Sequence, residues 1–224
     1  MKNLRDFIKT KIREFLNEQQ EEVLLTPNGD ESNLPKNLYD YVRTDEFKSW
    51  FGDWENNPNT SSKIVDENGE PMVYYKSMDS DEPFFGSAND YYYGITVVSP
   101  DYDVARGFQS KKGKTYSGFI KSYNPFDFRI PAHKDWLIKK ISNNKYAKLY
   151  TNTMNELGSA GYEYTPEELE YYVEEGAYSL LEWDVVYNMI KDKGYDSFYV
   201  MEDIGSDKEP NLVLFDKNQI KVVK

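Results

Sequence analysis

The chain has 224 residues, and its 39 acidic and 27 basic side chains give a formal net charge of −12. A field of that sign repels phosphate backbones, so we expect no general nucleic-acid binding. The lack of cysteine and the single histidine exclude disulfides, thiolate sites and multi-histidine sites, and we expect no metal. No apolar run approaches the roughly 18 residues that a membrane-spanning helix needs.

Residues 1–25 are predicted to contain an amphipathic helix, because apolar side chains recur every three or four positions between charged ones. These apolar positions are Leu4, Phe7, Ile8, Ile12, Phe15 and Leu16. The helix either docks on the domain or is a detachable targeting segment, and a membrane-surface helix is less favoured because its polar face mixes both charge signs. Residues 26–33 contain Pro, Asn and Gly and are interpreted as a linker.

Residues 34–224 are expected to form one α+β domain with strands at both ends and a helical block between them. Thr44 is predicted to cap a helix that Gly52 ends, and Thr165 and Glu168 have the spacing of a capping box. Helices are expected near 37–42, 44–51, 100–108, much of 136–181, and 182–193. Strands are expected near 72–75, 94–98, 116–121, 197–201, 211–215 and 220–223.

Several short motifs follow one another in a defined order. They are Phe47-Lys48-Ser49-Trp50-Phe51-Gly52, Gly69-Glu70-Pro71, Tyr93-Gly94-Ile95-Thr96, Asn124-Pro125, Gly194-Tyr195-Asp196 and Phe215-Asp216-Lys217-Asn218-Gln219-Ile220-Lys221. This order resembles the ADP-ribosyltransferase-like domains of phage and mobile-element polyvalent proteins, over roughly residues 44–224. The resemblance implies a split β-sandwich that holds NAD in a cleft between its halves.

The resemblance also implies positions for the NAD site. Lys76 stands where the family has the His that binds the nicotinamide ribose, and Ser77 stands at the Gly that follows it. Thr96 stands at the Tyr that stacks on nicotinamide, and Asn211 at the catalytic glutamate. Tyr75 and Gln219 complete the expected cofactor-binding set.

These departures from the family pattern matter chemically. Cleavage of the nicotinamide–ribose bond builds positive charge on the ribose, which a carboxylate stabilises and the neutral amide of Asn211 does not. Glu209, two residues earlier, is the carboxylate expected to replace it. Lys76 would hold a ribose hydroxyl or a phosphate. We expect the strand at 72–75 to lie beside the strand at 211–215, with Lys76 and Asn211 facing one cleft.

Three functions remain open on the sequence alone. The first is a divergent phage-type mono-ADP-ribosyltransferase that uses NAD to modify a host protein. The second is a catalytically silent binding module or an inhibitor of a host defence system, and the third is a structural component of the virion. The N-terminal segment resembles the capsid-targeting leaders of proteins packaged in tailed-phage heads, and Leu16 and Glu18 match the pattern that precedes cleavage in such leaders. These resemblances imply action in the host cytoplasm, after packaging in the virion if the leader interpretation holds.

Overall fold

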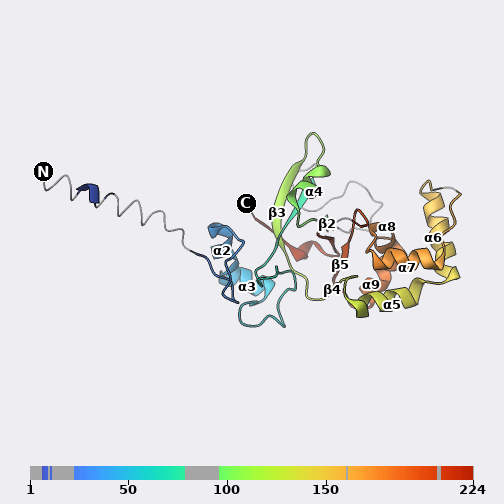
Figure 1. The fold of residues 1–224 in the computed structure, drawn as a ribbon, viewed down its shortest axis with the longest axis horizontal. Helices are drawn as coiled ribbons and strands as arrows, with labels where there is room; N and C mark the ends of the chain where they lie inside the picture. The colour runs from blue at the N-terminus through green and yellow to red at the C-terminus, as the bar shows by residue number, and fades with distance from the viewer. Residues whose placement is uncertain are drawn as a thin grey trace.

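The computed structural model describes residues 7–9, 11, 23–78, 96–159, 161–205 and 208–223. Two β-sheets form the centre of the molecule, and helices lie on both sides of them (Figure 1). The first sheet has the antiparallel order β1-β3-β7. The second has the order β2-β6-β5-β4, in which β4 and β5 run parallel. The strands are β1 (Val73–Met78), β2 (Thr96–Val98), β3 (Lys114–Ile120), β4 (Pro125–Phe126), β5 (Ser197–Val200), β6 (Asn211–Leu214) and β7 (Ile220–Val223).

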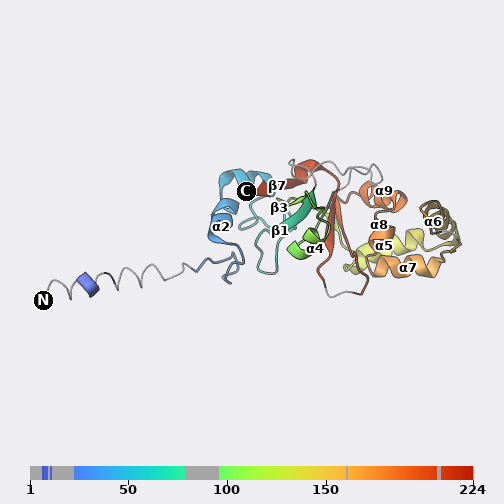
Figure 2. The same ribbon diagram turned by 90° about the horizontal axis from the view of Figure 1, so that it is seen from above.

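The helices fall into two groups that cover opposite ends of the molecule (Figure 2). One end has α2 (Lys36–Val42) and α3 (Asp45–Phe51), while α4 (Tyr102–Gly107) connects β2 to β3. The other end is a helical block inserted between β4 and β5, followed along the chain by the short 3-10 helix η1 (Lys217–Gln219) between β6 and β7. The block consists of α5 (Pro131–Ile141), α6 (Asn144–Glu156), α7 (Pro166–Glu174), α8 (Tyr178–Leu181) and α9 (Asp184–Asp192). This arrangement confirms the predicted α+β class.

Alternating burial along the strands divides the core into three layers. Val73 and Phe119 pack on α2 and α3, whereas their neighbours Tyr74 and Ile120 pack between the sheets. In β6, Val213 faces the helical block and the residues on either side of it face the first sheet. Because successive strand side chains point to opposite faces, each sheet separates two apolar layers.

The helix ends follow the predicted capping residues. The Thr44 hydroxyl accepts a hydrogen bond from the Phe47 amide at 3.3 Å, and Thr165 and Glu168 form the reciprocal capping box. Gly52 follows α3 with φ of 100°, a left-handed value that favours glycine. The region 136–181, predicted as mostly helical, is divided among α5, α6, α7 and α8.

The predicted pairing of the strands at 72–75 and 211–215 is wrong. Strand β1 belongs to the first sheet and β6 to the second, with β2 as the neighbour of β6. The sheets meet where Tyr75 exchanges two backbone hydrogen bonds with Ser99, at 2.7 and 2.9 Å. The short strand β2 therefore lies between β1 and β6.

Most of residues 1–25 lie outside the described residues, including Leu16 and Glu18 of the expected leader. Residues 7–9 are helical, and Phe7 and Ile8 are exposed. Within the part of the chain that the structure describes, no helix has both the length and the apolar character needed to cross a membrane.

The Glu70 side chain of the Gly-Glu-Pro turn is fully buried and forms an ion pair with Arg43. Its two oxygens accept hydrogen bonds from the Arg43 guanidinium at 2.6 and 3.1 Å. Arg43 also stacks on the Tyr39 ring, 3.4 Å from its centre, and contacts Glu55 at 3.1 Å. The turn that precedes β1 is thus fixed to the end of α2.

Replacing Arg43 by alanine should lower the free energy of unfolding by about 3–5 kcal/mol, because Glu70 would remain buried without its cation. Urea denaturation of parent and variant measures this loss. Lys36→Ala is the control: it removes an ion pair to Asp40 in which both side chains are more than half exposed, so the expected change is below about 1 kcal/mol. Similar values for the two variants would contradict the structural role of the Arg43–Glu70 pair.

Candidate functional site

The candidate site begins with Lys76 on β1, whose side chain crosses from the first sheet to the second. Its ammonium group donates a hydrogen bond to the Val97 carbonyl of β2 at 3.0 Å. Burial lowers the pKa of the Lys76 ammonium, and attraction to Glu182 partly offsets this effect. A partly buried lysine side chain therefore stands at the junction of the two sheets.

Two carboxyl groups from separate parts of the chain interact electrostatically in this region. Glu182 follows α8 in the helical block, and Glu202 follows β5 by two residues. Burial raises the pKa of the Glu182 carboxyl to about 8, and repulsion from Glu202 adds to this rise while Lys76 opposes it. The buried Oε1 atom of Glu182 has no hydrogen-bond partner among the described residues. Glu182 is therefore held mainly as the neutral acid near pH 7.

Backbone contacts fix the helical block beside Glu202. The Met201 amide donates to the Gly176 carbonyl at 2.7 Å, and the Tyr178 amide donates to the Met201 carbonyl at 3.2 Å. Gly176 has φ of 66°, and a Cβ atom there would lie 2.4 Å from the Phe128 ring. Only glycine fits this close approach without a shift, so α8 and Glu182 keep a defined position relative to the end of β5.

Asn211, a residue of the predicted site, contacts this cluster directly. Its side-chain amide donates to Glu202 Oε1 at 3.3 Å, and the Asn211 side chain is itself buried. Burial raises the pKa of Glu202, and the hydrogen bond from Asn211 opposes this rise. The structure thus connects Lys76, Glu182, Glu202 and Asn211 through successive interactions, and we call these four residues the charged cluster.

Glu209 lies on the surface instead. Its side chain is 72% exposed, and its carboxylate lies 3.6 Å from Arg129 Nη1. Arg129 in turn packs over the Tyr199 ring at 4.8 Å and makes two hydrogen bonds to Asp127, at 2.9 and 2.8 Å. Glu209 borders a surface depression of about 320 Å³ that Arg129 and Lys208 also line.

The other predicted residues have different surroundings. Tyr75 points away from Lys76 into a surface groove, as strand alternation requires. The Ser77 hydroxyl shares a hydrogen bond of 2.7 Å with Thr115, and Thr96 is buried in β2 opposite Leu214. Within the predicted set, Lys76 and Asn211 are therefore linked only indirectly, through Glu182 and Glu202, and Tyr75 lies on the other face of β1.

Gln219 uses both ends of its amide to hold the backbone. Its oxygen accepts hydrogen bonds from the Phe215 and Asp216 amides, both at 2.9 Å. Its nitrogen donates to the Lys121 carbonyl at 3.2 Å and to the Asp196 carbonyl at 2.9 Å. Through these contacts, the Gln of the Phe-Asp-x-x-Gln ending joins separate parts of the backbone, a structural role that requires no ligand.

Sequence reasoning missed Glu182 and Glu202. Glu182 follows the apolar pair Leu180 and Leu181, and Glu202 follows a β run that ends in Met201. An acid at the end of an apolar run is an ordinary solvated position, so neither residue carries a local signal of burial. Their interaction depends on the docking of α8 against the end of β5, which is a tertiary contact.

No protein-family model matches the chain, and comparisons with curated proteins and with solved structures find no match. Among the described residues, no group of three or more His, Asp or Glu side chains is arranged to hold a metal ion. Chemically, the charged cluster offers a cation, a neutral carboxyl that can donate or take up a proton, and a second carboxyl oriented by an amide.

The raised pKa of Glu182 predicts a specific dependence of stability on pH. Between its ordinary value of 4.5 and about 8, the folded state holds a proton that the unfolded state has released. Stability contributed by this group therefore falls as pH rises through that window, by about 1 kcal/mol per pH unit, and levels off above it. Glu182→Gln should remove this component when urea unfolding is followed between about pH 5.5 and about pH 7.5.

Glu167→Gln removes an exposed carboxyl from the same helical block and controls for the change in net charge. Its pH profile should match that of the parent. If Glu182→Gln also left the profile unchanged, Glu182 would be ionised in the folded protein and paired with Lys76.

Proposed function

We propose that the protein is a divergent phage-type mono-ADP-ribosyltransferase that uses NAD as a substrate to modify a host protein. The observation that carries this proposal is the charged cluster, in which Glu182 interacts with the partly buried Lys76 and with a second carboxyl group near the junction of two sheets. The ordered sequence motifs support the same proposal independently, since the resemblance that they carry assigns the nicotinamide ribose to Lys76 and Asn211. The ADP-ribosyltransferase-like split sandwich is part of this proposal.

The proposed roles follow from charge and hydrogen bonding. Lys76 would donate to a ribose hydroxyl or to a phosphate of NAD, exchanging its bond to the Val97 carbonyl for one to the ligand. When the glycosidic bond breaks, nicotinamide leaves with the bonding electrons and the ribose carbon becomes electron-poor. A carboxylate close to that carbon stabilises the developing charge.

Glu202 suits the carboxylate role better than Glu209. Glu202 is bonded by the buried amide of Asn211 and interacts with Glu182, which interacts with Lys76. Glu209 is exposed and is paired with Arg129. Asn211 would then act as a positioning residue, because it orients Glu202 and does not itself supply a carboxylate.

A second candidate function is a silent binding module that keeps the charged cluster but catalyses no reaction. One observation favours it: Lys76 already bonds to a backbone carbonyl and Glu182 is held mainly neutral. Such a module would act as an inhibitor of a host defence system, whereas a virion component would have only a structural role. The module would bind its partner without consuming NAD, which separates it from the enzyme.

The two candidates are distinguished by titrating NAD by calorimetry and then following transfer of labelled NAD to proteins of a host lysate. If the enzyme proposal holds, Lys76→Met should weaken NAD binding at least tenfold. Glu202→Gln should lower the transfer rate by about 100-fold while changing NAD affinity less than threefold, because its charge acts mainly in the transition state.

Glu209→Gln is the matched control, since it makes the same chemical change on the exposed side of Arg129. It should keep most of the transfer activity. Loss of transfer in Glu209→Gln but not in Glu202→Gln would reverse the assignment of the carboxylate. NAD binding with no transfer by the parent protein would favour the silent module.

A further inference from the structure

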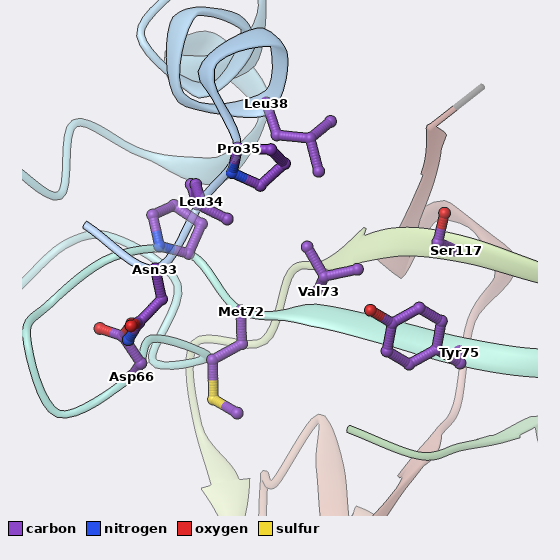
Figure 3. Close-up of a pocket in the computed structure, with 10 residues that line it drawn as sticks. Asn33, Leu34, Pro35, Leu38, Asp66, Met72, Val73, Tyr75 and Ser117 are labelled. Carbon is purple, nitrogen blue, oxygen red and sulfur yellow. The ribbon is translucent and has the colours of Figure 1, made fainter. Parts of the chain in front are cut away.

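The face of β1 that points away from Lys76 forms one wall of an open groove (Figure 3). Leu38 lies on α2, and Leu34 and Pro35 directly precede that helix. Val73 and Tyr75 lie on β1, and Met72 directly precedes that strand. The groove has a volume of about 370 Å³, and most of its lining is apolar. This volume is of the size that proteins use to enclose several apolar side chains of a ligand or a peptide.

The sequence of the N-terminal segment predicts an apolar helix face. Phe7 is 60% exposed and Ile8 is 48% exposed, and the apolar periodicity continues to Ile12, Phe15 and Leu16. An isolated helix of this length is marginally stable in water, and tertiary packing of its apolar face normally supplies the missing stability. This face therefore needs a surface on which to pack.

The chain enters the domain directly beside the groove. The Ser32 amide donates to the Leu24 carbonyl at 2.7 Å, and the next residue, Asn33, is part of the groove lining. The eight residue steps from Leu16 to Leu24 span about 12 Å as helix and up to about 26 Å when extended. That reach allows the apolar face to fold back over the groove.

Charge is compatible with the same arrangement. The Asp66 carboxylate lies at the groove, where it accepts a hydrogen bond from Asn33 at 3.1 Å. Lys9 and Arg13 lie on either side of Ile12 in the sequence. A helix that inserts Ile12 would bring a basic side chain toward this carboxylate.

We propose that the groove is the docking site for the apolar face of residues 2–16 of the same chain. Docking would cover Val73 and Tyr75 on one face of β1, directly behind Tyr74 and Lys76 on the other. The segment would therefore brace the strand that positions Lys76. The proposal does not depend on the proposed function, because docking requires no NAD.

Paramagnetic relaxation in the full-length chain tests the docking. Since the sequence has no cysteine, Asn37→Cys provides one nitroxide attachment point on the exposed side of α2 without filling the groove. The amide signals of residues 4–16 should fall below half of their diamagnetic intensity. A nitroxide on Lys148→Cys, exposed on α6 in the other group of helices (Figure 1), should leave these signals unchanged.

The double variant Ile12→Asp with Phe15→Asp should restore the signals of labelled Asn37→Cys, because it places charges in the apolar face. The matched variant Thr10→Asp with Asn17→Asp changes polar positions and should not restore them. Full intensity with the Asn37 label would overturn the proposal. Broadening that arises only when labelled chain is mixed with separate isotope-enriched chain would also overturn it, in favour of a second copy as the occupant.

Discussion

Strand β1 is the element on which both halves of the molecule depend. It pairs along its length with β3, and two hydrogen bonds join Tyr75 to Ser99, the residue that follows β2 of the second sheet. Because strand side chains alternate, Tyr74 and Lys76 point inward while Val73 and Tyr75 point into the surface groove. The Arg43–Glu70 ion pair fixes the turn that leads into this strand. The position of Lys76 is thus set by backbone pairing on both sides.

The charged cluster is difficult to explain by stability alone. A buried carboxyl whose pKa is raised to about 8 weakens folding near neutral pH, and a buried lysine amine adds a further desolvation penalty. An apolar residue at position 182 would avoid the first of these effects. Groups that reduce stability yet remain in a defined geometry are typical of sites that bind ligands or move protons. The cluster lies where the helical block meets the end of β5, so the inserted block contributes chemistry as well as packing.

Local signals in the sequence predicted the elements well and their pairing less well. Capping by Thr44 and Thr165 depends on neighbouring residues, and the structure confirms both. The order of strands depends on contacts between distant segments, and here the sequence gives no local signal that β2 separates β1 from β6. The same limit applies to the site. Lys76 and Asn211 were predicted from motif position, whereas Glu182 and Glu202 become neighbours only through the docking of α8 against Met201.

The central claim is that NAD binds at the charged cluster, in which Glu182 interacts with both Lys76 and Glu202. A crystal structure of the full chain with a non-hydrolysable NAD analogue tests this claim most directly. The account predicts that the nicotinamide ribose lies within hydrogen-bond distance of the Lys76 ammonium and that the Glu202 carboxylate faces the glycosidic carbon. A ribose bound against Glu209 and Arg129, with the charged cluster unchanged, would contradict it.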